Sequence, residues 1–178
     1  MASTIKNDLS LKYSRGTILI HWISLFLILV LIPTGFIMAN TKPDQTKLLL
    51  LKVHLLVGMT VFILTLVRVW FFVRHKRPAH LQTGSVFHDK LVVWVDNSFY
   101  VVLLLLALSG IATIITGGLG ETITTGVDSR LPDRLNVPPL AAHQFLAKLL
   151  IALLLAHVFG VINHYLKFRE NTLKRILP

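Results

Sequence analysis

Residues 143–164 read HQFLAKLLIALLLAHVFGVINH. The run is apolar and long enough to cross a bilayer, for which an α-helix needs about 20 residues. It nevertheless contains three imidazoles, those of His143, His157 and His164, spaced fourteen and then seven residues apart. At about 100° per residue, both steps return to nearly the same face of a helix. The run therefore predicts a membrane helix whose histidines point into a bundle, because polar side chains in membrane spans usually avoid lipid.

Three earlier stretches of the chain are equally long and apolar. The expected membrane helices cover residues 17–39, 48–73, 91–116 and 140–166. Hydrophobic residues make up 54% of the 178 residues, and they lie in long runs rather than in the short alternating blocks of a soluble core. The first run is expected to be retained, because it is longer than a signal-peptide core and lacks a small-residue cleavage site. Residues 1–178 are thus predicted to form one all-α integral membrane domain, a four-helix bundle.

The distribution of charge predicts how the bundle is oriented. Of the 18 Lys and Arg residues, eleven flank the apolar runs on one side of the predicted membrane. The positive-inside rule places those segments, and with them both termini, in the cytoplasm. The net charge of +10 does not indicate nucleic acid, because these cations form no basic groove with interleaved aromatics. The absence of cysteine excludes disulfides, Cys-ligated iron–sulfur clusters and covalently attached c-type haem.

Four histidines form two pairs when their depth is counted at about 1.5 Å per residue. His21 and His157 lie roughly 27 and 26 Å below the outer ends of their runs, whereas His54 and His143 lie roughly 9 and 5 Å below theirs. The crossed pairings would separate the partners by more than about 15 Å, which one metal centre cannot bridge. Two level pairs in opposite halves of a bundle are what two bis-histidine haems require. Taken singly, each histidine has the alternative role of an interhelical hydrogen-bond partner.

Three other residues share a face with these histidines. Gly35 and Arg68 each follow a histidine by fourteen residues, and Gly58 lies one turn after His54. A glycine lets a flat macrocycle approach the backbone, although small residues are also common at ordinary helix contacts. Arg68 near the bilayer centre needs an anionic partner or water, and a haem propionate would serve.

Together these residues resemble the bacterial cytochrome b561 family. The resemblance covers nearly the whole chain and is carried by KYSRGTILIHW at 12–22, by His54 with Gly58 and Arg68, by His143, and by HVFGVINHYLKFRENTLKRILP at 157–178. It implies a dihaem protein of the bacterial inner membrane, in lipid. It also implies that His54 and His143 hold the outer haem b, and that His21 and His157 hold the inner one.

Within that family the chain looks similar to small stand-alone members, one of which is a superoxide oxidase that passes electrons from superoxide to ubiquinone. The resemblance therefore implies an oxidoreductase of this kind, with ubiquinone as a second cofactor. Cations at the outer face would attract the superoxide anion. The candidates are Lys42, Lys47, Lys52, Arg130, Arg134 and Lys148. Lys148, inside the fourth run, is the most informative of them, and its alternative role is snorkelling to the interface.

The inner side carries the candidates for binding the quinone. His164 lies one heptad after His157 on the same face and is suited to hydrogen-bond a quinone carbonyl and relay a proton. His88, beside Asp89, is a second candidate at that level. Both histidines have the alternative role of interfacial side chains. Asp96 is expected to pair with a buried cation, with inward proton transfer as its alternative. His75 and His80 are expected to be solvated, and the long outer loop is expected to form a helical turn near residues 130–135.

Two other functions compete with superoxide oxidation. The first is that of an electron-transfer subunit without catalysis of its own, docked to a separate periplasmic oxidoreductase or cytochrome. The second is that of a transporter that uses the histidines for a metal or for protons, but the chain lacks the discontinuous helices and inverted repeats common in transporters.

Overall fold

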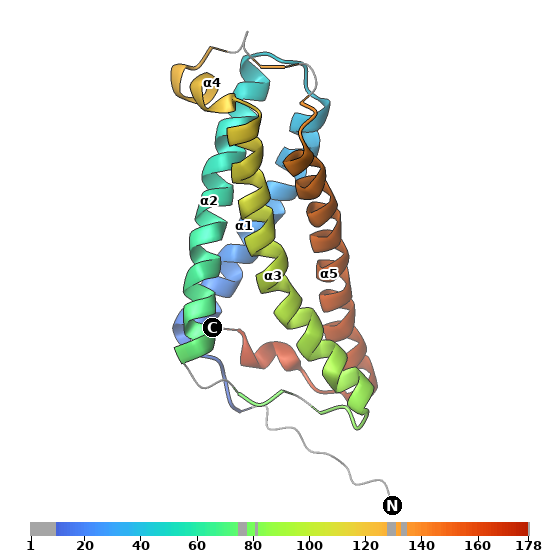
Figure 1. Cartoon of the computed structure of the whole chain (residues 1–178). Helices are drawn as coiled ribbons and strands as arrows, with labels where there is room; N and C mark the ends of the chain where they lie inside the picture. Colours follow the sequence, from blue (N-terminus) through green and yellow to red (C-terminus); the bar gives the residue numbers. More distant parts are fainter. Residues whose placement is uncertain (1–9, 75–77, 81, 128–130, 133–134, 178) are drawn as a thin grey trace, which may run out of the picture.

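The structure is a helical bundle. The computed structural model describes residues 10–74, 78–80, 82–127, 131, 132 and 135–177, and within them all regular elements are helical. Four long helices run alongside one another (Figure 1), namely α1 (Arg15–Asn40), α2 (Gln45–Arg74), α3 (Val86–Thr116) and α5 (Pro138–Phe168). All four are long and apolar enough to cross a membrane. The all-α, four-helix membrane architecture predicted from the sequence is therefore confirmed.

The helices extend beyond the expected spans at their polar ends. α3 begins at Val86, five residues before the expected start, because Ser85 caps it by accepting a hydrogen bond from the His88 amide. α5 begins at two prolines, which suit the first turn of a helix since that turn leaves its amides unpaired. α1 contains Pro33, which is tolerated in membrane helices when neighbouring groups compensate for the missing amide donor.

Two short helices were not anticipated from the sequence. α4 (Leu119–Thr125) lies at the end of the bundle predicted to face outward, and the 3-10 helix η2 (Thr172–Arg175) lies at the opposite end (Figure 1). α4 is bounded by Gly118 and Gly126, whose backbones have φ angles of 63° and 77°. This left-handed conformation is easily adopted only by glycine. The helical turn expected near residues 130–135 falls mostly outside the described residues, which include only 131, 132 and 135 of that segment.

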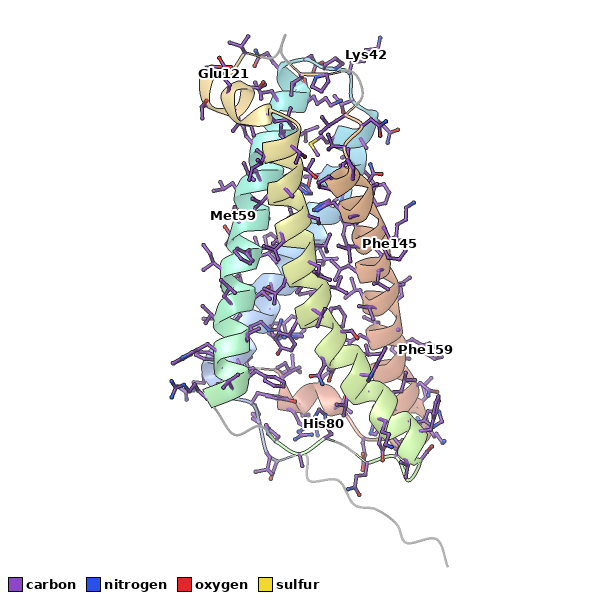
Figure 2. All side chains as sticks on the ribbon, viewed as in Figure 1. Lys42, Met59, His80, Glu121, Phe145 and Phe159 are labelled. Atoms are coloured by element: carbon purple, nitrogen blue, oxygen red, sulfur yellow. The ribbon has the colours of Figure 1, made fainter. Side chains whose placement is uncertain are left out.

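The outer surface of the bundle is apolar, as lipid requires. Phe145 and Phe159 on α5 are 67% and 69% exposed, and Figure 2 shows both on the outward side of that helix. Large apolar side chains exposed along every long helix would be unusual in water, where contiguous apolar patches are small. The surface therefore agrees with immersion of all four helices in a bilayer.

An apolar layer crosses the middle of the bundle. It consists of Ile28, Val61, Val102, Leu103 and Leu150, which are buried against one another. Leu150 lies midway between His143 and His157 in the sequence, so the layer separates the two predicted levels of histidine. α1 packs mainly against α2, and α3 packs mainly against α5. Each of the two helix pairs thus contributes to both levels.

The end of the chain closes the inner end of the bundle. We call residues 172–177 the C-terminal clasp. Its Arg175 is only 6% exposed and donates two hydrogen bonds, from Nε to the Leu11 carbonyl at 3.0 Å and from Nη2 to the Ala79 carbonyl at 2.9 Å. The indole of Trp22 in α1 donates to the Ile176 carbonyl at 2.9 Å. The clasp therefore ties together the segment before α1, the loop before α3 and α1 itself.

Candidate functional site

The outer pair of histidines meets across the bundle. His54 comes from α2 and His143 from the first turns of α5, and their ring centroids lie 6.2 Å apart with an angle of 70° between the ring planes. Bonds from a metal to imidazole nitrogens are about 2 Å long, so two rings on opposite sides of one metal have centroids roughly 6 Å apart. The spacing therefore leaves room for a metal between the rings.

A hydrogen bond fixes which nitrogen of His143 carries the proton. Its Nδ1 lies 3.0 Å from the Leu106 carbonyl oxygen and 3.2 Å from the Ser109 hydroxyl. A carbonyl oxygen only accepts, so Nδ1 of His143 must be the donor. Its Nε2 is therefore the unprotonated nitrogen with the lone pair. This is the tautomer of a metal-ligating histidine, whose other nitrogen commonly donates to a carbonyl.

His54 is oriented in the same way by α1. Its Nδ1 lies 3.1 Å from Oγ1 of Thr34, and that hydroxyl lies 2.9 Å from the Val30 carbonyl oxygen. A hydroxyl can both donate and accept. When it donates its proton to the carbonyl, it accepts from Nδ1 of His54, and this arrangement leaves Nε2 of His54 with a free lone pair as in His143. Neither Thr34 nor Ser109 was singled out in the sequence.

Two glycines leave space beside these rings. A Cβ added to Gly35 would lie 3.4 Å from Cε1 of His54, and one added to Gly110 would lie 3.3 Å from Cε1 of His143. Gly35 was expected to share a helix face with His21 of the inner pair, but in the structure it lies against His54 of the outer pair. A Cβ at Gly58 would meet only Leu31, at 4.0 Å. Close approach to a histidine thus explains Gly35 and Gly110, whereas Gly58 makes an ordinary helix contact.

The inner pair is surrounded by charge. His21 in α1 interacts electrostatically with His157, Arg68 and Asp96. Nδ1 of His157 in α5 lies 3.2 Å from Oδ1 of Asp96 in α3. His21, His157, Arg68 and Asp96 thus lie at the same level of the bundle, within range of one another's charge. The partner found for Asp96 is a half-buried imidazole, and Phe99 packs edge-on against that ring, with centroids 5.7 Å apart.

Two buried polar atoms at this level have no hydrogen-bond partner within the described part of the chain. They are Nε of Arg68 and Oγ of Ser24. The Arg68 guanidinium lies 5.4 Å from the centroid of the Tyr100 ring, and Ser24 follows His21 by one turn of α1. Buried polar groups are normally hydrogen-bonded, so such orphans indicate a missing partner. A cofactor with an anionic group would supply it for Arg68.

These features fit two haems better than bare metal ions. No three His, Asp or Glu side chains gather into a metal site in the residues that the structure covers, whereas a structural or catalytic zinc takes three or four protein ligands. Two opposed imidazoles suit the axial positions of a macrocycle that supplies the other ligands. The tautomer of His143, the ring spacing of the outer pair and the orphaned Arg68 Nε all agree with that arrangement.

The remaining candidates lie away from both pairs. His164 is largely buried and its Nε2 contacts Oε2 of Glu170 at 2.9 Å, near the inner end of α5. His88 is exposed and bonded to the Ser85 hydroxyl at 2.9 Å. Lys148 is exposed on α5, and His80 is exposed near η2 (Figure 2). His75, Arg130 and Arg134 lie outside the described residues.

The contacts that sequence reasoning missed are those made between helices. The histidine partners Thr34 and Ser109 lie on α1 and α3, and nothing in their local sequence marks them. Asp96 was expected to have a charged partner, but its contact with His157 was not identified. The clasp contacts of Arg175 were likewise missed, because they join segments far apart in the sequence.

Comparison with known proteins agrees with this geometry. Residues 12–178 match the family model described as prokaryotic cytochrome b561. The chain is also similar to cytochrome b561 homolog 1 of Escherichia coli strain K12, with 23% identity over 173 residues, covering 94% of this chain and 97% of that relative. Proteins of this family are four-helix, multi-pass cytochromes of the cytoplasmic membrane that bind haem b, typically two. Because the family model matches almost the whole chain, this protein belongs to the prokaryotic cytochrome b561 family and is a membrane electron carrier of that type.

Proposed function

We propose that this chain is a superoxide oxidase that carries electrons from superoxide at the outer face to ubiquinone near the inner face. The observation that carries the proposal is the two levels of histidine, separated by an apolar layer, with His143 held in the metal-binding tautomer and Nδ1 of His54 hydrogen-bonded to a hydroxyl. His54 and His143 hold the outer haem, and His21 and His157 hold the inner one. Each haem, when bound, supplies an iron that exchanges one electron at a time.

The outer end supplies positive charge for an anionic donor. Lys42 is exposed at that end (Figure 2), and Lys148 is exposed on α5, five residues after His143. Lys52 lies two residues before His54, and its Nζ would be 3.7 Å from a Cβ at Gly126 beside α4. Such cations raise the local concentration and the association rate of an anion. Superoxide drawn to this end gives up one electron and leaves as oxygen.

The inner end contains a side chain, His164, that can donate a proton to quinone. Two superoxide ions supply the two electrons that, with two protons, convert one quinone to quinol. Nε2 of His164 is held by Glu170, whose side chain is 21% exposed, so the other ring nitrogen remains for a quinone carbonyl. In the imidazolium form, paired with the Glu170 carboxylate through Nε2–H, His164 would donate its Nδ1 proton to that oxygen and be reprotonated at Nδ1 before the next turnover. Arg68 holds the anionic edge of the inner haem in place.

The proposal is tested with the purified protein and its variants. The oxidised and dithionite-reduced spectra, with haem quantified per chain, are expected to show two low-spin b haems. Superoxide generated enzymatically is then expected to reduce ubiquinone, more slowly in His164→Ala and Lys148→Ala, and at the original rate in the control His80→Ala. Unchanged rates in the first two variants, with both haems bound, would remove these residues from the mechanism.

The same preparation distinguishes the competing functions. A stable periplasmic partner that co-purifies with a chain inactive towards superoxide would identify an electron-transfer subunit. A colourless protein after careful purification would contradict the assignment of the histidines as haem ligands and leave them as metal or proton sites.

A further inference from the structure

One carboxylate lies inside the membrane-spanning part of the bundle. Asp96 is the only Asp or Glu in residues 17–39, 48–73, 91–116 and 140–166. An acidic residue at such depth costs about 2.5–3.5 kcal/mol on insertion scales, so it normally has a partner and a function. Its Oδ1 lies 3.2 Å from Nδ1 of His157, and both side chains are 35% exposed. The carboxylate therefore faces Nδ1 of His157, the nitrogen that is also hydrogen-bonded in the two outer histidines.

Among the described residues, the partners of Nδ1 in the outer histidines are neutral groups. Nδ1 of His54 contacts a threonine hydroxyl, and Nδ1 of His143 contacts a carbonyl and a serine hydroxyl. These three groups are neutral. The two levels therefore use the same ligand type and the same nitrogen for support, but only the inner level has an anion behind the ligand. This difference does not follow from the need to hold the ring, because neutral acceptors already do so at the outer level.

A carboxylate behind a ligating imidazole changes the metal as well as the ring. It fixes the Nδ1–H tautomer and raises the basicity of the ligand, and hydrogen bonding around the ligand is one of the levers that set a haem potential. A more basic ligand and a nearby negative charge both stabilise the oxidised iron. The inner haem then becomes harder to reduce and a stronger reductant once it is reduced.

We propose that Asp96 is a positioning residue that polarises His157 and lowers the reduction potential of the inner haem, so that this haem is the stronger donor to quinone. The inference rests on the proposed ligand role of His157. Arg68 also lies near the inner histidines, and its positive charge raises the reduction potential of the inner haem because it favours the reduced iron. Asp96 and Arg68 together set the inner potential, whereas the described groups that hydrogen-bond to Nδ1 of the outer histidines are neutral.

The test is a potentiometric titration of both haems in the complete protein. Asp96→Asn keeps the size and a hydrogen-bond acceptor but removes the charge. It is expected to raise the potential of the inner haem by about 59 mV or more, which is a tenfold change in the equilibrium of its reduction, and to leave the outer haem unchanged. Asn97→Ala, which removes the exposed neighbouring side chain of α3, serves as the control and is expected to shift neither potential.

The possible outcomes separate this inference from the function on which it rests. Unchanged potentials in Asp96→Asn with both haems bound, or an equal shift of both haems, would overturn the role of Asp96 alone. If Asp96→Asn loses the inner haem, Asp96→Glu decides: a retained haem at the original potential supports the proposal, and loss in both variants reduces Asp96 to a helix contact. A His157→Ala protein that keeps two haems would instead contradict the ligand assignment itself.

Discussion

The outer and inner halves of the bundle hold the same pair of side chains in different electrostatic surroundings. In the outer half, His54 and His143 are oriented by hydroxyl and carbonyl groups only. In the inner half, His157 contacts Asp96, and an Arg with an orphaned Nε lies nearby. Ligand identity thus determines that a haem can bind, whereas the neighbours of the ligands determine what each haem does.

The two ends of the bundle are also closed by different forces. At the outer end, α4 packs through Leu119 onto Leu48 and Leu51 of α2 in an apolar cluster. At the inner end, the C-terminal clasp is held by hydrogen bonds from Arg175 and Trp22. Apolar closure is non-directional and tolerates some movement, whereas hydrogen bonds of a buried cation require one geometry. The inner end is therefore the more precisely positioned of the two.

The largest effect is expected when one ligand of each half is removed. His54→Ala should abolish the outer haem, and His157→Ala should abolish the inner one, so that each variant keeps one of two haems. The reason is that a haem held by one of the two proposed imidazoles would lose half of its axial ligation. Haem per chain, measured after alkaline pyridine extraction, checks this.

The result also tests whether the halves are independent. The apolar layer around Val61 and Leu150 separates the two levels, so the surviving haem should keep its spectrum and potential. Loss of both haems in either variant would show that the halves fold as one unit.

A smaller but still large effect is expected at the clasp. Arg175→Ala removes hydrogen bonds of a buried charge, each worth about 1.5–3 kcal/mol. The amides of Ile176 and Leu177, which donate to the Leu173 carbonyl, should lose at least about 100-fold of their protection against hydrogen exchange, because the two lost bonds together are worth about 3 kcal/mol or more. Lys174→Ala changes the exposed neighbour and should leave that protection intact. Equal loss in both variants would mean that Arg175 does not hold the clasp.

A moderate effect is expected from crowding the outer pair. In Gly110→Ala the new methyl group would lie 3.3 Å from Cε1 and 3.4 Å from Nδ1 of His143, so the ring or the helix must shift. Overpacking of this kind costs about 1–3 kcal/mol, and the outer haem should show an altered low-spin electron paramagnetic resonance signal. Gly160→Ala is the matched control, because a Cβ there meets nothing within 4 Å. An unperturbed outer signal in Gly110→Ala would contradict the tight fit around His143.

Hydropathy and spacing were sufficient to predict the four helices and the pairing of the outer histidines, but not the side chains that hydrogen-bond to those histidines. The lengths of the apolar runs predicted four spans, and depth counting paired His54 with His143, which the structure brings to 6.2 Å between ring centroids. The partners of Nδ1 depend on how each helix is rotated about its axis, and a single sequence fixes this only loosely. Thr34 resembles any other membrane threonine that bonds back to its own helix. Only tertiary packing distinguishes it.

The smallest effect is expected at Thr34. This variant measures how much a neutral hydrogen-bond partner contributes at the outer haem, for comparison with the charged partner at the inner haem. Thr34→Val keeps the shape of the side chain but removes the neutral acceptor of His54 Nδ1. A neutral hydrogen bond contributes about 0.5–1.5 kcal/mol net, so the equilibrium constant for reduction of the outer haem should rise about twofold to tenfold, which raises its potential by about 20–60 mV. Thr60→Val is the control, because the exposed Thr60 hydroxyl bonds only to the Leu56 carbonyl of its own helix.

Comparison of Thr34→Val with Asp96→Asn isolates the contribution of charge. Both variants weaken support for the Nδ1–H of one proposed ligand, both shifts should be upward, and each should affect a different haem. If the shift at the outer haem equalled the shift at the inner haem, the hydrogen bond alone would account for both, and the negative charge of Asp96 would have no separate effect. A clearly larger inner shift would mean that the carboxylate differentiates two otherwise equivalent pairs of histidines, because the ligands, the nitrogen involved and the helical framework are the same in each half.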